Sequence, residues 1–159
     1  MAEAPRSHLP LSPVDPLIGL DLVELRAAKI PWVGAIAVHY WFVVVQGDRR
    51  DRWEIWQRRG VGGRHWGHLH QNLMAPTSGV GNGGSWCERS WTGAIADRLA
   101  QELIASPTTY PHRDRYRYWP GPNSNTYAQW ILDRAAVDHD LGPRGLGKSH
   151  HRIFPKTTS

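Results

Sequence analysis

The chain has 159 residues, a length suited to one domain with a full hydrophobic core, and its 40% hydrophobic and 21% charged residues exclude an intrinsically disordered protein. The net charge of +5 permits an anionic partner such as nucleic acid, lipid or an acidic substrate, but it is too small to require one. The single cysteine, Cys87, excludes an intramolecular disulfide and a zinc site built on several cysteines.

The sequence carries no recognisable signal for a membrane or for export. No apolar run reaches the roughly 18 residues that a membrane-spanning helix needs. Residues 1–16 also lack the basic start and apolar centre of a signal peptide. We therefore expect a cytoplasmic protein, while delivery elsewhere by another signal stays open.

The N-terminal part begins with a proline-rich segment. Residues 1–16 carry four prolines and predict a mobile arm, whereas residues 17–159 are expected to form a single globular domain. Residues 17–30 have a partial apolar stripe, which predicts a short helix that Pro31 ends. Residues 33–46 are apolar at both alternating positions, and this pattern indicates a central strand buried on both faces.

A hairpin and further strands are expected after the central strand. Turn residues at 47–50 and the strand pattern of 52–57 complete the hairpin. A third strand is expected near 65–73. An irregular loop rich in Gly, Ser and Asn at 76–85 then leads to a short edge strand at 86–91.

The C-terminal part predicts a helix and an extended tail. Residues 92–105 have one apolar face that includes Ile95 and Ile104, and Pro107 is expected to stop this helix. From about residue 138 the chain is rich in glycine, proline and basic residues, so we expect an extended tail that lies over the domain.

A second helix is predicted over residues 123–136, directly after a Pro/Gly turn. Ser124, Tyr127 and Ile131 follow the helical spacing, so Ser124 should face the core rather than solvent. Together with the strands, these helices predict an α+β fold in which a small, mainly antiparallel sheet packs against two or three helices.

Ser124 lies at a position where chemistry is possible. A helix start offers free N–H groups and the positive end of the helix dipole, which suit a nucleophile and a developing oxyanion. A hydroxyl needs a base, and His39 lies in the middle of the central strand. Glu54, on the neighbouring strand, is the candidate that orients the imidazole. Asn123 and Asn125 flank the serine and are candidate substrate-binding residues.

The same residues also have a purely structural interpretation. The polar residues at the helix start can simply cap the helix, and His39 can be a hydrogen-bonded histidine of the core. The nine tryptophans are open to two interpretations as well. Trp86 and Trp119 are candidate substrate-binding residues of a cleft, but large flat side chains also close a small core.

Three other polar segments lack a specific motif. His65, His68 and His70 cluster on one predicted strand, but no acidic residue follows them closely, so we expect no metal. Arginine and tyrosine alternate over 113–119, a pattern that can contact phosphates and bases but that a solvated loop with inward-packed tyrosines explains equally well. Lys148 follows glycines at the wrong spacing for a phosphate-binding loop, and no cofactor is expected.

The string WPGPNSNTY at 119–127 resembles the signature of an uncharacterised bacterial family known only as a domain of unknown function. The preceding YPHRDRYRY and the later LGPRGLGKS belong to the same resemblance. The similarity extends from about residue 38 to residue 149, which is most of the chain. It implies no established activity.

More distantly, the chain resembles the circularly permuted papain-like superfamily, which includes lecithin retinol acyltransferase-like proteins. In that superfamily a histidine on an early strand precedes a cysteine nucleophile at a helix start. The strand VHYWFVV with His39 and the helix start NSNTY with Ser124 look like these two segments, with serine at the cysteine position. The resemblance implies a permuted papain-like fold and a hydrolase or acyltransferase for an amide or ester, with Ser124, His39 and Glu54 as its catalytic residues.

Two other classes of function stay open. The same pocket could bind a peptide, glycan or lipid group without catalysis. Alternatively, the segments that combine arginine with aromatic residues could bind nucleic acid, and the affinity would then fall with the logarithm of the salt concentration. The substrate and the oligomeric state are not indicated by the sequence.

Overall fold

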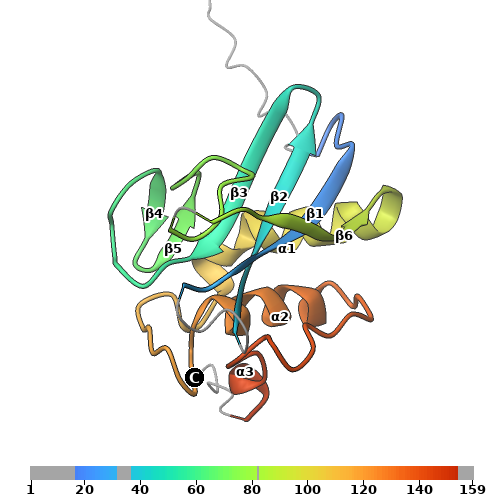
Figure 1. Cartoon of the computed structure of the whole chain (residues 1–159). Coiled ribbons are helices and arrows are strands. Elements are labelled where there is room, and N and C mark those ends of the chain that lie inside the picture. The colour runs from blue at the N-terminus through green and yellow to red at the C-terminus, as the bar shows by residue number, and fades with distance from the viewer. Residues whose placement is uncertain (1–16, 32–36, 82, 154–159) are drawn as a thin grey trace, which may run out of the picture.

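The structure is a computed structural model that describes residues 17–31, 37–81 and 83–153 (Figure 1). Its strands are β1 (Leu22–Lys29), β2 (Val38–Gln46), β3 (Arg49–Ile55), β4 (Arg64–Trp66), β5 (Leu69–Gln71) and β6 (Trp86–Trp91), and its helices are α1 (Gly93–Thr109), α2 (Ser124–Arg134) and α3 (His150–Ile153). The strands form one antiparallel sheet in the order β4-β5-β3-β2-β1-β6, and α1 and α2 pack on one face of it. The predicted α+β class is confirmed. The predicted arm at 1–16 lies outside the described residues.

β2 occupies the centre of the sheet because it is apolar on both faces. Tyr40 and Phe42 belong to the core cluster that α1 and α2 complete, whereas Trp41 and Val43 belong to a second cluster on the opposite face. The predicted central strand is confirmed from Val38 onward, and its first residues, 33–36, lie outside the described part. The predicted hairpin is also confirmed. Its turn is shorter than the expected 47–50, because β3 already begins at Arg49.

The prediction of a short helix over 17–30 is wrong, because this segment contains β1. Val23, Leu25 and Ala27 are fully buried while the residues between them are half-buried, which is the period of two that a strand requires. β1 pairs with β2 on one side and with β6 on the other. These two partners supply backbone hydrogen bonds that a local preference for helix cannot offset. β6 lies at the sheet edge, as predicted.

The predicted third strand is a small hairpin of two strands, β4 and β5. Gly67 forms the bend between them with a φ of 67°, a conformation that favours glycine. A Cβ at this position would also collide with the carbonyl oxygen of Arg113. The glycine therefore allows the hairpin to turn directly against the loop that follows α1.

α1 extends past Pro107, so the prediction that this proline stops the helix is wrong. Proline lacks the N–H that would bind the carbonyl of Leu103, but the hydroxyl of Ser106 donates to that carbonyl at 2.7 Å. The buried face is formed by residues such as Leu99 and Leu103, while Ile95 and Ile104 are 37% and 40% exposed. Among the described helices, neither this one nor any other is long and apolar enough to cross a membrane.

The tail after residue 138 runs across the start of α2 and then forms α3 (Figure 1). Side chains from the first turn of α2 hold it in place. The amide of Asn123 donates to the carbonyl of Leu146 at 3.0 Å, and the hydroxyl of Thr126 donates to the carbonyl of Gly147 at 2.7 Å. The tail is therefore part of the structure that surrounds Ser124.

Candidate active site

A histidine and a glutamate form a buried pair between the two central strands. His39 on β2 and Glu54 on β3 point away from α1 and α2, since the alternate residues of both strands belong to the helix-covered core. Nε2 of His39 lies 2.9 Å from Oε2 of Glu54, and the side chains are 6% and 0% exposed. The structure thus places these two predicted site residues in direct contact.

Arg52 holds the same carboxylate from the other side. Its Nε lies 2.7 Å from Oε1 of Glu54, and its Nη2 donates to Oε2 at 2.8 Å. Its Nη1 donates to the carbonyls of Ala75 and Ser78, and the guanidinium lies 4.1 Å from the ring centre of Trp41. Arg52 was not among the predicted site residues. The alternation Arg-Trp-Glu was the available signal, because it puts both charges on one face of a strand.

The electrostatics of this cluster determine which nitrogen of His39 is basic. Burial alone would raise the pKa of Glu54, but the hydrogen bond and charge of His39, together with those of Arg52, outweigh it and hold that pKa below its ordinary value. The ionised carboxylate can only accept, so Nε2 of His39 carries a proton. Within the described residues Nδ1 makes no hydrogen bond, which leaves it as the basic atom of the ring.

The start of α2 is fixed by an asparagine cap. Oδ1 of Asn123 accepts from the N–H groups of Asn125 at 2.9 Å and Thr126 at 3.1 Å, and the hydroxyl of Thr126 accepts from the N–H of Asn123. This reciprocal arrangement is a capping box. The side-chain amide of Asn123 donates to the carbonyl of Tyr118. Both ends of Asn123 are therefore occupied within the protein.

Asn125 attaches the helix to the central strand on both sides of His39. Its amide donates to the carbonyl of Val38 at 2.8 Å, and its Oδ1 accepts from the N–H of Tyr40 at 3.2 Å. Since Asn125 follows Ser124 directly, this attachment brings the serine to the part of β2 that carries the histidine. Asn125 thus has a positioning contact that sequence patterns did not indicate.

Ser124 and His39 line the same cavity, which has a volume of about 100 Å³. The Ser124 side chain donates a long hydrogen bond of 3.5 Å to Oδ1 of Asn125, and within the described residues it makes none to His39. Catalytic hydrogen bonds are often long or misaligned before substrate binds, so the shared cavity is the relevant geometric relation. Among the described residues, the rest of the lining is formed by Ile30, Ile55, Trp56, Gln57, Val80, Tyr116 and Tyr118.

Two of these walls come from the alternating arginine and tyrosine segment. Tyr116 and Tyr118 line the cavity, while the intervening Arg115 and Arg117 are exposed. The ring of Tyr116 also stacks on His68, with the ring centres 5.7 Å apart. This division agrees with the interpretation of the segment as a solvated loop whose tyrosines pack inward.

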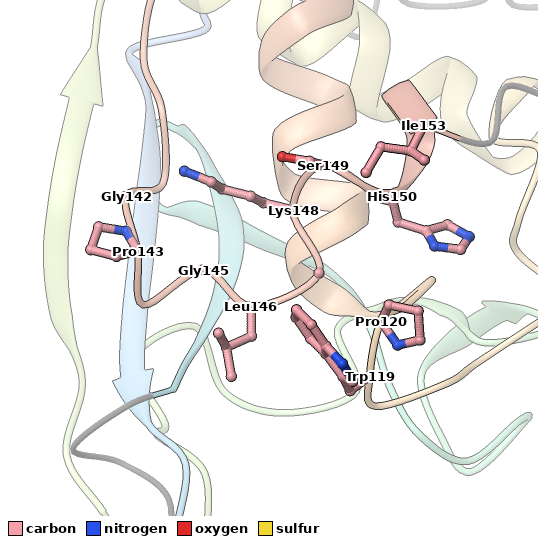
Figure 2. Close-up of a pocket in the computed structure, with 11 residues that line it drawn as sticks. Trp119, Pro120, Gly142, Pro143, Gly145, Leu146, Lys148, Ser149, His150 and Ile153 are labelled. Carbon is pink, nitrogen blue, oxygen red and sulfur yellow. The ribbon is translucent and has the colours of Figure 1, made fainter.

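The two candidate tryptophans do not line this cavity. Trp119 is 62% exposed and contributes to a neighbouring cavity of about 320 Å³ between the Pro/Gly turn and the tail. Figure 2 shows this second cavity, with Trp119 and Pro120 beside the tail residues around Lys148. Trp86 lies on the edge strand β6, where its indole N–H donates to Glu88.

The β4–β5 hairpin pairs His65 with His70, whose ring centres lie 5.9 Å apart, and leaves His68 in the bend between the two strands. His68 Nδ1 lies 2.9 Å from the carbonyl of Trp56, and His70 Nδ1 lies 2.8 Å from the carbonyl of His68. His65 is exposed on β4. In the described part of the chain, no group of three or more His, Cys, Asp or Glu side chains is arranged to hold a metal ion.

Replacement of Gly147 by alanine should destabilise the protein through the α2 cap. A Cβ at Gly147 would collide with the side-chain amide of Asn123, and the glycine has a φ of 85°. Gly142 is the matched control, because it has a φ of 73° but open space around it. Urea unfolding should show a loss for Gly147→Ala that exceeds the loss for Gly142→Ala by about 1 to 3 kcal/mol. Equal losses would show that the cap is unaffected.

Comparison with known proteins gives one match. The family model described as "Protein of unknown function (DUF3750)" matches residues 21–150 of the chain. No curated protein and no solved structure matches the chain. The matched residues include β1 to β6, α1 and α2, and therefore every residue of the candidate site.

Proposed function

Since the chain belongs to the DUF3750 family of proteins of unknown function, we propose its function from the site: a hydrolase or acyltransferase that acts on an amide or ester through Ser124. His39 would be the general base and Glu54 the residue that orients it. The proposal includes the permuted papain-like arrangement, in which the histidine strand precedes the nucleophile helix. Supporting this arrangement, β2 carries His39 and the later helix α2 begins with Ser124.

The observation that carries the proposal is the cavity shared by Ser124 and His39. Ser124, at a helix start, and His39, whose Nδ1 makes no hydrogen bond within the described residues, line the same small space. Behind the imidazole, Glu54 accepts from Nε2–H and so sets the tautomer in which Nδ1 can take a proton. These are the parts that acyl transfer through a serine requires.

In the first half-reaction, Oγ of Ser124 attacks the substrate carbonyl and its proton passes to Nδ1 of His39. The new Oγ–C bond gives a tetrahedral oxyanion. When this collapses, the bond to the leaving alcohol or amine breaks, and His39 returns the proton to that group. Water then attacks the acyl group, gives a proton to His39, and the C–Oγ bond breaks as Ser124 regains its proton.

The oxyanion needs donors that the fold has not already used. The cap accepts from the N–H groups of Asn125 and Thr126, so the N–H of Ser124 itself is the available group of the helix start. Gln57 lines the cavity, and its side chain makes no hydrogen bond within the described residues. We assign these two groups to the oxyanion. Asn123, a candidate from the sequence, has its side chain engaged elsewhere.

The test is covalent labelling with a serine-directed fluorophosphonate. Wild type should be labelled and Ser124→Ala should not, because the alanine lacks the nucleophile. Ser149→Ala is the matched control, since Ser149 lines the neighbouring cavity and should not affect labelling. Equal labelling of wild type and Ser124→Ala, or no labelling of wild type, would overturn the proposal.

A non-catalytic binding domain is the second candidate. The observation that favours it is the hydrogen bond of the Ser124 hydroxyl to Asn125 rather than to His39. In that case wild type would remain unlabelled. The cavity would then bind a peptide, glycan or lipid group as a recognition pocket.

A further inference from the structure

We propose that the substrate is an anion whose phosphate or carboxylate group binds beside the cavity that Ser124 and His39 line. The binding groups form an arginine rim, defined as Arg58, Arg115 and Arg117. This inference rests on the proposed function and names the substrate class of the same site. It comes from the distribution of charge along the chain, from the position of two loops beside the cavity, and from the arginines that these loops leave unpaired.

The positive charge of the chain is concentrated in two short segments. Residues 57–60 and 111–118 contain five arginines and one acidic residue, Asp114, so they account for four of the five net positive charges of the chain. The rest of the chain is therefore almost neutral as a set. A charge excess that is confined to one region attracts anionic ligands and raises their local concentration.

Both segments border the cavity. Gln57 lines it from the first segment, and Tyr116 and Tyr118 line it from the second. Each arginine of the rim is the direct neighbour in sequence of one of these lining residues, and all three arginines are exposed. The charge excess therefore lies at the solvent-facing edge of the cavity that contains the proposed nucleophile.

The backbone that carries these arginines is held in place by contacts with neighbouring elements. The N–H of His68, in the bend between β4 and β5, donates to the carbonyl of Arg113 at 2.7 Å. The N–H of Arg117 donates to the carbonyl of Pro122, in the turn before α2, at 2.8 Å. Binding of an anion would therefore order the arginine side chains but not the backbone, which lowers the entropic cost of binding.

The arginine rim has no partner of its own in the described part of the chain. Asp114 is already shared, because its carboxylate lies 3.0 Å from Nη2 of Arg59 and 3.5 Å from Nε of Arg113. The guanidinium groups of the rim make no hydrogen bond or ion pair with any described residue. A guanidinium presents a planar fork of N–H donors that matches the oxygens of a carboxylate or phosphate. The rim therefore offers unused donors of the type that such an anion requires.

The cavity does not oppose an anion at this edge. None of its described lining residues is Asp or Glu. The nearby carboxylate of Glu54 is fully buried, and Arg52 contacts both of its oxygens. An anionic group on the arginine rim is therefore attracted by three positive charges, while no acidic side chain of the described lining repels it.

The experiment measures hydrolysis of p-nitrophenyl esters in pairs that differ by one charged group. The α-p-nitrophenyl ester of N-acetylglutamate is matched with that of N-acetylglutamine, and the ester of N-acetylphosphoserine with that of N-acetylserine. Wild type should cleave the charged member of at least one pair at least about fivefold faster, in kcat/KM, than the neutral member. The pair with the larger ratio identifies the anion as a carboxylate or a phosphate. Salt at about 0.5 M should remove most of the preference, because it screens exposed charges.

Variants of the full chain assign the preference to the arginine rim. The triple variant Arg58→Gln/Arg115→Gln/Arg117→Gln should lower the ratio of charged to neutral ester cleavage at least about fivefold. Arg50→Gln is the matched control. Arg50 is also exposed and without a side-chain partner among the described residues, but it lies near the end of β3 opposite to Ile55, which lines the cavity. Its replacement should keep the ratio.

The possible outcomes separate the two proposals. If wild type cleaves none of the four esters above the Ser124→Ala background, the proposed function fails and this inference fails with it. If the neutral esters are cleaved as fast as the charged ones, in a reaction that requires Ser124, the function stands and the inference about the substrate is wrong. A preference for the charged esters that persists in the triple variant would contradict the assignment to the arginine rim.

Discussion

Replacement of Arg52 by methionine is expected to lower the free energy of unfolding by about 3 to 5 kcal/mol. Methionine can fill the path of the arginine stem, but it leaves Glu54 fully buried without its cationic partner. The carbonyl oxygens of Ala75 and Ser78 would also lose their donors. The cost is large because the desolvation of the remaining carboxylate is no longer offset. Urea unfolding measures it directly.

Two further variants make this prediction specific. Arg49→Met alters an arginine on the same strand that is 65% exposed and paired with Asp51, so it should change stability by less than about 1 kcal/mol. The double variant Arg52→Met/Glu54→Gln removes the unpaired charge and should recover part of the stability. A loss of less than about 1 kcal/mol in Arg52→Met would show that the buried pair contributes little.

Replacement of His39 by alanine is expected to reduce the turnover of an ester substrate about 10²- to 10⁴-fold, because it removes the proposed general base. The effect should fall on kcat more than on KM, since the proposed role of His39 is to transfer a proton rather than to bind the substrate. The measurement is steady-state hydrolysis of p-nitrophenyl butyrate, together with urea unfolding to confirm that the variant is folded.

Chemical rescue distinguishes a base from a structural residue. Imidazole added to His39→Ala should restore part of the turnover, because it can occupy the vacated space and accept the proton. His65→Asn is the control, since His65 is exposed on β4 and should leave turnover unchanged. Full activity in a folded His39→Ala protein would exclude the histidine from the reaction.

The strongest sequence patterns predicted the elements that matter most for the site. The strand β2 was recognised from its apolar run, because it is buried on both faces along almost its whole length. The helix α2 was recognised from its polar start and from the helical spacing of the residues that it buries. The pairing of His39 with Glu54 followed from the hairpin between β2 and β3. The fold class followed in turn from the order of the elements.

Other parts depended on contacts that are distant in the sequence. β1 has only eight residues, and its strand structure comes from pairing with β2 and β6, which local propensity does not encode. Pro107 remains helical because Ser106 satisfies the carbonyl that proline cannot. In both cases a local rule was overridden by a specific hydrogen-bond partner.

The candidate site was only partly predictable for the same reason. Ser124, His39 and Glu54 were selected by residue type, but the pocket that Ser124 and His39 share is bordered by loop residues such as Val80 and Tyr118. Loops have no periodicity that reports which side chain faces inward. The attachment made by Asn125 could not be anticipated either, because it joins segments 87 residues apart.

At the start of α2 the structural hydrogen bonds are made by the neighbours of Ser124, so the residue at position 124 can be replaced by another small residue without loss of these bonds. The neighbours Asn123 and Asn125 make the bonds that cap the helix and dock it on β2, while the side chain of Ser124 makes only one long bond of its own. A change from one small nucleophilic residue to another would therefore alter the reactivity of the pocket without altering its architecture. A protein built in this way can exchange an alcohol for a thiol at this position while it keeps the same scaffold.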